Sequence, residues 1–242
     1  MELCVKTKPQ IIKSYLLFIP IFFCSCVISE VESEIQDVID DVENIVDQTA
    51  TYQVSFVFDW NSTDFPNEYP SSAHFSPLVG WVHEKDHPFF DEGRLASNGI
   101  EQMAETGSTN SLIDELETLI DQNEGLATHT GSGLNSGVGT ISIDIDVNSD
   151  FPAVSLATML APSPDWFVAA ININLLDENN EFFLEKTIVG NVYDAGTEDG
   201  NTFSFNNEET QPQDPITRIT QPPLGDGTNV KASLCTVTFT KQ

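Results

Sequence analysis

Two short corners of the sequence each place a carboxylate directly after an apolar run. Asp165 lies in the segment Pro-Ser-Pro-Asp-Trp-Phe at residues 162–167, which follows the apolar run 154–161. Asp194 begins the segment Asp-Ala-Gly-Thr-Glu-Asp-Gly, which closes a second apolar run. Prolines and glycines end strands, so both acids should stand at strand ends, where one sheet edge could gather them. Gathered oxygen ligands suit a hard cation such as Ca²⁺, although an aspartate in a turn also commonly caps its own backbone.

Another pair of acids lies on a strand-like run at residues 140–148. Alternation places isoleucines and a valine on one face and a polar set on the other, which comprises Ser142, Asp144, Asp146 and Asn148. Like charges side by side on one strand face repel each other unless water or a cation lies between them. The pattern therefore adds an argument for a cation site.

The sequence gives little support to catalytic chemistry. It contains no Gly-rich phosphate loop, nucleophile elbow or zinc motif. Asp144 with Asp146 would suit the carboxylate pair of a hydrolase, but no other feature suggests a substrate cleft. His74, His83 and His87 lack zinc spacing and have no cysteine nearby, so we interpret them as hydrogen-bonding residues. The sequence therefore predicts a protein that is not an enzyme.

The elements that would position these acids are short and separated by turns. Runs with apolar residues at alternate positions, or buried throughout, indicate strands at residues 52–60, 140–148, 154–161, 168–176, 182–189 and 231–240. Such a series predicts an all-β, antiparallel β-sandwich.

Two helical patterns interrupt the series of strands. They cover residues 96–105 and 110–122, the second with Asn110 as a cap, and Gly107 and Gly125 are expected to end them. We expect this short helical insertion to cover one end of the sandwich. The Gly-, Ser- and Thr-rich stretch at 124–138 is expected to be a mobile loop.

Four segments carry a family resemblance when they are taken in order. They are AHFSPLVGWVH at 73–83, GRLASNGIEQMAETG at 93–107, VSLATMLAPSPDWFVA at 154–169 and YDAGTEDG at 193–200. Together they resemble the spondin domain, the amino-terminal module of F-spondin and mindin, which also occurs alone in bacterial proteins. The likeness covers about residues 51–240. It implies an antiparallel sandwich similar to calcium-dependent lipid-binding modules, with an extracellular matrix or adhesion role.

The resemblance also implies a calcium ligand set. The family holds its ion with an acid on the strand before the Val-Ser run, with the Asp of PSPDW and with the first Asp of the DAGT corner. Carried onto this chain, these are Asp146, Asp165 and Asp194, with Asp144 as the fallback for the first. Family members carry Glu at the first position, so Asp146 would be a shorter substitute. Backbone carbonyls and waters would complete the roughly 6–8 ligands of the ion.

Composition limits the partners that the protein can have. The chain of 242 residues carries a formal net charge of −29 and has a pI near 4.1. This surface repels nucleic acid and anionic headgroups, so we expect no nucleic-acid partner, whereas divalent cations would be attracted. The residues after the leader and linker suffice for one domain with a full core.

The amino-terminal residues have the pattern of an export signal. Three lysines precede an apolar run that is broken by Pro20, and the run ends in Phe-Cys-Ser-Cys at 23–26. We therefore expect a signal peptide at 1–25. The four residues at 23–26 resemble a bacterial lipobox. This predicts a lipid on Cys26 and anchoring at the outer membrane or cell surface. A plain cleaved signal is the alternative.

An acidic linker is expected between the leader and the domain. Residues 26–50 carry apolar residues at helical spacing, which indicates a partly helical spacer or a short coiled coil before a domain at 51–242. Once the leader is removed and Cys26 lipidated, Cys235 remains without a disulfide partner. We expect it to be a buried, inert thiol.

Three classes of function remain open. The first is a surface-displayed, calcium-binding module for adhesion to, or recognition of, an extracellular protein or glycan. The second is a calcium-dependent lipid- or glycan-binding sandwich, in which the ion itself meets the ligand. The third is a structural envelope lipoprotein that uses calcium only for stability.

Overall fold

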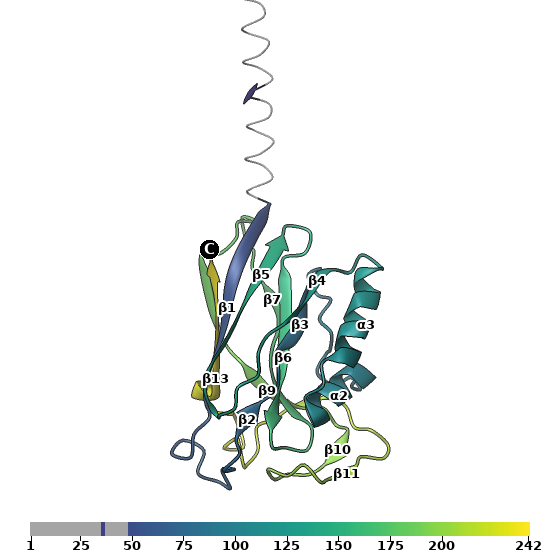
Figure 1. The fold of residues 1–242 in the computed structure, drawn as a ribbon, viewed down its shortest axis with the longest axis vertical. Coiled ribbons are helices and arrows are strands. Elements are labelled where there is room, and N and C mark those ends of the chain that lie inside the picture. Colours follow the sequence, from purple (N-terminus) through teal and green to yellow (C-terminus); the bar gives the residue numbers. More distant parts are fainter. Residues whose placement is uncertain (1–34, 37–47) are drawn as a thin grey trace, which may run out of the picture. The chain divides into compact units, whose positions relative to one another are not determined.

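The computed structural model describes residues 35–36 and 48–242. The expected signal peptide, Cys26 and most of the expected linker lie outside the described residues. Residues 48–242 belong to one compact unit, which is an antiparallel sandwich of two sheets (Figure 1). Among the described residues, no helix has the length and apolar character needed to cross a bilayer.

The smaller sheet has the strand order β5-β1-β13-β8. Its strands are β1 (Thr49–Asp59), β5 (Val138–Asn148), β8 (Glu185–Val189) and β13 (Cys235–Lys241). In β1, buried and exposed residues alternate along almost the whole strand, as the sequence predicts. The first and last described strands pair with each other, and the Gln242 N–H donates to the Thr51 carbonyl oxygen (2.9 Å).

The larger sheet has the order β12-β9-β7-β6-β3-β4, and the short β2 also pairs with β6. Its members are β2 (His74–Phe75), β3 (Val79–His83), β4 (Gly125–Thr130), β6 (Ala153–Ala161), β7 (Trp166–Asn174), β9 (Asn191–Asp194) and β12 (Thr217–Arg218). A separate two-stranded ribbon joins β10 (Glu198–Asp199) to β11 (Glu208–Glu209).

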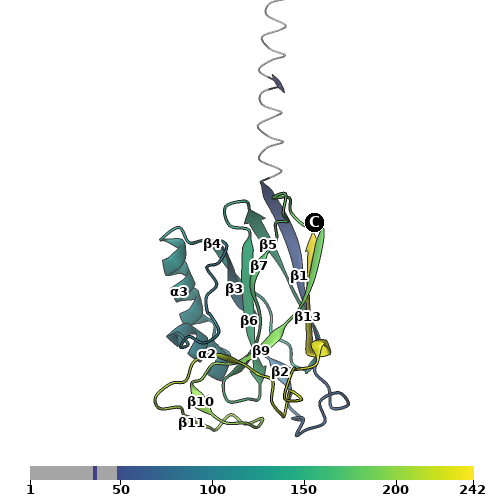
Figure 2. The ribbon, with the colours of Figure 1, turned by 180° about the vertical axis from the view of Figure 1, so that it is seen from behind.

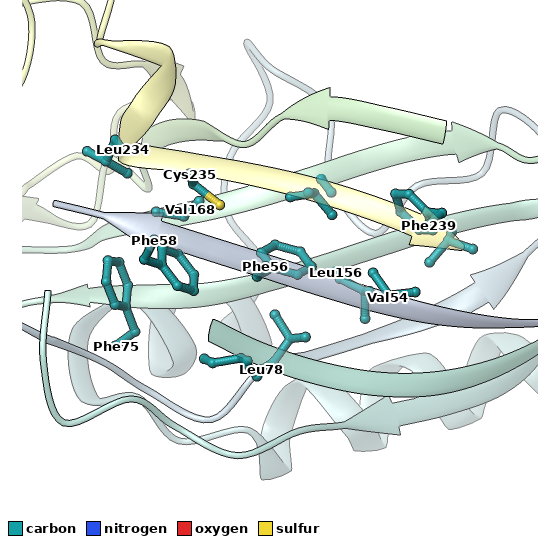
Figure 3. Packing of buried hydrophobic residues seen from close by; sticks show 14 of the residues in the cluster. Val54, Phe56, Phe58, Phe75, Leu78, Leu156, Val168, Leu234, Cys235 and Phe239 are labelled. Carbon is teal, nitrogen blue, oxygen red and sulfur yellow. The ribbon is translucent and has the colours of Figure 1, made fainter. Parts of the chain in front are cut away.

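The main core fills the space between the two sheets. Val54, Phe56 and Phe58 of β1 face Leu156 and Val168 of the larger sheet (Figure 3). Phe58 stacks on Phe75 with ring centroids 3.9 Å apart. Cys235 belongs to the same core as a free, buried thiol, and its burial raises its pKa, which confirms the expectation of an inert residue.

Two helices form a third layer on the outer face of the larger sheet (Figures 1 and 2). Helix α2 (Asn98–Thr106) and helix α3 (Asn110–Ile120) pack their apolar residues against side chains of β3, β6 and β7 in a second core. The expectation that the helices cover one end of the sandwich was therefore wrong. Their position explains why every residue of β6 is buried, because this strand has a core on each face.

Three local expectations were also wrong. Asn110 is the first residue of α3, and the N-cap is Thr109. Gly107 does end α2, with φ 70° in the left-handed region, but α3 ends at Ile120 and Gly125 begins β4. The stretch at 124–138, expected to be a loop, thus contributes an edge strand that pairs with β3. Except for Leu126, the residues of β4 are small or polar. Pairing to β3 therefore decides their conformation where the local sequence pattern does not.

The helical layer makes a prediction about stability. Leu112 of α3 is 1 % exposed, and Leu112→Ala should lower the free energy of unfolding by about 2–5 kcal/mol because it leaves a cavity between helix and sheet. Glu117→Ala, on the exposed side of the same helix, should change it by less than about 0.5 kcal/mol. Denaturant unfolding of both variants measures the difference, and equal effects would contradict the packing described here.

Candidate metal centre

Strand pairing brings Asp165 and Asp194 to the same edge of the larger sheet. Asp165 immediately precedes β7, Asp194 is the last residue of β9, and Trp166 is the direct cross-strand partner of Asp194. The Ala195 N–H donates to the carbonyl oxygen of Asp165 (3.2 Å). The convergence of these two acids, predicted from the sequence, is therefore present in the structure.

The corner that carries Asp165 is fixed by a buried serine. The Ser163 hydroxyl donates to the Leu160 carbonyl oxygen (2.5 Å) and accepts from the Trp166 N–H (3.1 Å). These bonds tie the end of β6 to the start of β7 across the two prolines. Asp165 is consequently held by the backbone of a rigid corner.

The Asp165 carboxylate is completely buried and only half satisfied. Its Oδ2 atom accepts from the Thr197 N–H (2.7 Å), the Glu198 N–H (3.1 Å) and the Thr197 hydroxyl (3.2 Å). Its Oδ1 atom is buried and has no hydrogen-bond partner. Because a buried, unpaired carboxylate oxygen costs free energy, this atom indicates a missing positive group or donor.

Asp194 is held less tightly and lies partly exposed. Its Oδ1 atom accepts from the Gly196 N–H (2.9 Å), and its Oδ2 atom accepts from the indole N–H of Trp166 (3.2 Å). Gly196 has a φ of 75°, and a Cβ atom there would collide with the carbonyl oxygen of Asp214. Glycine is therefore required for the turn that aims its N–H at Asp194.

Burial makes both acids hard to ionise, and the charge of Asp165 adds to this effect at Asp194. Burial raises the pKa of Asp165, although its bonds from Thr197 and Glu198 act in the opposite direction. Burial, and then the charge of Asp165, raise the pKa of Asp194 to about 6. A cation between them would remove this penalty, since an opposite charge favours both ionised forms.

Two further acids near the site were missed by sequence reasoning. Burial raises the pKa of Glu105 in α2, which is also affected by a hydrogen bond from Thr197 and by the charges of Glu198 and Asp165. Asp214 contributes to the raised pKa of Asp194, and its N–H donates to the Gly196 carbonyl oxygen (2.9 Å). No spacing in the sequence could have placed them here, because their positions depend on where α2 packs and on a long irregular loop.

Asp146, the third predicted ligand, does not join this group. It lies in β5 opposite Thr51, whose hydroxyl donates to it (2.6 Å). It precedes the start of β6, whereas Asp165 follows the end of β6. At about 3.3 Å per residue, that strand separates the two by on the order of 25 Å. Asp144, the fallback for this ligand, lies on the same distant strand.

Whether a metal ion fits this site depends on the ligand atoms that are present besides those of Asp165 and Asp194. Across the part of the chain that the structure describes, no group of three or more His, Cys, Asp or Glu side chains is arranged to hold a metal ion. Asp165 and Asp194 nevertheless fit Ca²⁺ in donor type, and the unpaired Oδ1 atom of Asp165 marks a place for a cation. Such an ion would draw its other ligands from backbone carbonyls and waters.

Two of the three histidines, His74 and His83, serve as hydrogen-bonding residues, as predicted. His87 instead lies 3.6 Å from a carboxylate oxygen of Glu84 and 3.8 Å from one of Glu124. His83 is fully buried and contacts the Glu84 carbonyl oxygen through Nδ1 (2.7 Å) and the Ser155 hydroxyl through Nε2 (2.7 Å). The Ser155 Oγ atom also accepts from the Asn172 N–H (2.9 Å). This chain of bonds lies where the pairing of β6 with β7 shifts register, so the imidazole stabilises an irregular part of the sheet.

These features define a class of protein, an antiparallel sandwich of two sheets with acids on the loops at one edge. The Spondin_N family model matches residues 50–229 of the chain. The chain therefore belongs to the spondin amino-terminal domain family, which confirms the resemblance seen in its sequence.

Similarity to individual spondin proteins supports this assignment. Spondin-2 of Homo sapiens is 33% identical over 175 residues, which cover 71% of this chain and 53% of that protein. Spondin-2 of Rattus norvegicus is 33% identical over 177 residues, and spondin-1 of Rattus norvegicus is 28% identical over 180 residues, 22% of its length. The chain thus spans about half the length of the spondin-2 proteins and about a fifth of spondin-1.

The raised pKa of Asp194 makes a prediction for the calcium-free protein. A folded pKa near 6, against 3.8 as the ordinary value, means that the wild type loses stability as the pH rises through this window. Asp194→Asn should therefore be more stable than the wild type at pH 7 in chelator, by about 1–3 kcal/mol. The advantage should vanish near pH 4, and unfolding curves at several pH values would detect it. A variant that is less stable at pH 7 would contradict the repulsion.

The pKa of His83 leads to a second prediction, in which stability depends on pH with the opposite sign. Burial lowers its pKa from 6.5 to about 4, so the unfolded state binds the proton more readily. Stability from this residue should be complete above pH 6.5 and lost progressively toward pH 4, by about 3 kcal/mol. Unfolding of His83→Gln should lack this loss, whereas His74→Gln, at the surface, should retain it. A wild-type slope that persists in His83→Gln would rule out the assignment.

Proposed function

We propose that this protein is a calcium-binding extracellular module for adhesion or recognition, and that it is not an enzyme. The observation that supports this most directly is the unpaired, buried Oδ1 atom of Asp165, an acid whose charge raises the pKa of Asp194. Membership of the spondin domain family supports the extracellular setting. Asp165 and Asp194 are the proposed calcium ligands.

The ion would act by fixing the loops at one end of the sandwich. Asp165 belongs to the corner between β6 and β7, whereas Asp194 begins the loop that leads to β10. A cation bound to both would lock these two segments together and remove their repulsion. The result is a rigid surface of loops with which a partner can form a complementary interface.

The export and anchoring features belong to the same proposal. The chain would be secreted and held at the outer membrane or cell surface by lipid on Cys26, which lies outside the described residues. Several acyl chains give stable attachment, whereas one gives only marginal binding. The anchor would display the loop end to extracellular proteins or glycans.

One observation favours a second candidate, in which the ion itself meets a glycan or a lipid headgroup. A solvent-open pocket of about 330 Å³ adjoins Asp194, so an ion there would have room for a ligand oxygen. The complete burial of Asp165 favours instead an ion that mainly stabilises the fold, as in a structural envelope protein.

Thermal unfolding of the full chain tests the calcium site. Calcium at about 100 times its dissociation constant should stabilise the wild type by about 2.7 kcal/mol relative to chelator. Extracellular modules bind on the order of 10⁻⁴–10⁻³ M, so the titration must reach tens of millimolar, with sodium chloride of equal ionic strength as the reference.

Two variants make this experiment specific. Asp165→Asn should abolish the calcium-dependent rise in Tm, whereas Asp146→Asn should leave it intact because Asp146 lies at the other end of the domain. Emission of Trp166, whose indole N–H bonds to Asp194, offers a second readout. A wild-type Tm that is the same in calcium and in chelator would remove the metal from the proposal.

A further inference from the structure

A histidine and a methionine line one pocket beside the end of α2 and the short strand β2. The pocket has a volume of about 410 Å³, and both His74 and Met159 belong to its wall. Its lining contains no Asp, Glu, Lys or Arg. The donors available to a ligand here are therefore softer than the carboxylates of the candidate calcium site.

Strand pairing places the two side chains on the same face of the larger sheet. His74 is directly opposite Ala161 in the pairing of β2 with β6, and Met159 lies two residues before Ala161 on the same face of β6. His74 and Met159 are therefore diagonal cross-strand neighbours, a relation that lies within reach of long side chains. Phe75 and Leu160 point to the opposite face, into the main core.

The imidazole of His74 is oriented as in many metal-binding histidines. Its Nδ1 atom lies 2.7 Å from the carbonyl oxygen of Ser72. A carbonyl oxygen can only accept, so Nδ1 carries the proton and the lone pair of the neutral ring lies on Nε2. Among the hydrogen bonds of the described residues, none engages Nε2. A bond from the other ring nitrogen to a backbone carbonyl is the usual way in which a protein holds a ligating histidine.

The thioether of Met159 lies next to a glycine that leaves room around it. A Cβ atom on Gly107 would lie 3.6 Å from Sδ of Met159 and 2.8 Å from Cβ of Ser76. The sulfur therefore lies in the pocket wall where residue 107 has no side chain to cover it. The Ser76 hydroxyl is already engaged, because it donates to the Pro77 carbonyl oxygen (3.2 Å) and accepts from the Met159 N–H (2.9 Å).

We infer that this pocket binds a soft monovalent cation of the Cu⁺ type through Nε2 of His74 and Sδ of Met159. Thioether sulfur is a soft ligand that favours Cu⁺, and imidazole also suits copper, whereas calcium and magnesium take oxygen ligands. A closed-shell Cu⁺ ion tolerates a low coordination number, so a histidine and a methionine can hold it. The negative charge of the chain attracts cations of any kind.

Methyl NMR of the full chain, labelled with ¹³C at the methionine methyl groups, tests the inference. The probe is Ag⁺, which has the ligand preferences of Cu⁺ and does not change its oxidation state in air. Because thiolates are strong ligands for such ions, Cys4, Cys24 and Cys26, which lie outside the described residues, are replaced by serine in every sample.

The expected result is a change in one methionine signal. The chain has three methionines, at positions 1, 103 and 159. Equimolar Ag⁺ should shift the signal of Met159 and leave that of Met103, which is fully buried, in place. Met159→Leu, which nearly conserves volume, identifies the signal by its disappearance.

Two histidine variants make the experiment specific. His74→Gln should abolish the shift of the Met159 signal, whereas His87→Gln, the matched control at an exposed histidine, should leave it unchanged. An unchanged Met103 signal in both variants shows that the fold is intact. A Met159 signal that stays in place in the wild type, or that moves as far in His74→Gln, overturns the inference. The calcium site uses other residues, so the calcium experiment on Tm succeeds or fails separately.

Discussion

The bonds from the Thr197 and Glu198 amides to the buried carboxylate of Asp165 connect the two parts of the loop end. One part is the proline corner between β6 and β7, and the other is the loop after β9. Together with the pairing of β7 and β9, these bonds hold Asp194 and Asp165 at the same edge of the sheet, while Oδ1 of Asp165 has no partner. The arrangement is unfavourable in isolation, since two carboxylates share a site of low polarity. The candidate metal centre follows from that imbalance.

The position of Asp165 depends in turn on the three-layered packing. Strand β6 is buried on both faces, by the smaller sheet on one side and by α2 and α3 on the other. A strand enclosed in this way cannot slip in register without moving both cores. The carboxyl end of β6 is therefore held in one position, and the corner that follows it is rigid for the same reason. The aromatic contact between Trp166 and Phe203 extends the support to the loop beyond Asp199.

Much of the architecture could be predicted from the sequence, because alternation in residues 52–60 and 140–148 and the unbroken apolar run of β6 reflect their burial directly. The convergence of Asp165 and Asp194 was also predictable, since each stands where a strand ends or begins. The edge strand β4 was missed because its polar sequence does not indicate burial. Asp146 was misplaced because it precedes β6, so that the whole length of this strand separates it from Asp165. Glu105 and Asp214 could not be predicted as neighbours of the site, because their positions depend on tertiary packing alone.

The pairing of the first and last described strands places the start of β1 and residue 242 at the same end of the domain. Thr49 at the start of β1 and the C-terminal Gln242 lie at the same end as the turn between β5 and β6, whereas Asp165 lies beyond the far end of β6 (Figure 1). Any tether joined to either terminus is therefore attached at the opposite pole from the acidic loops. A tether at that end leaves those loops facing away from the point of attachment, toward approaching molecules.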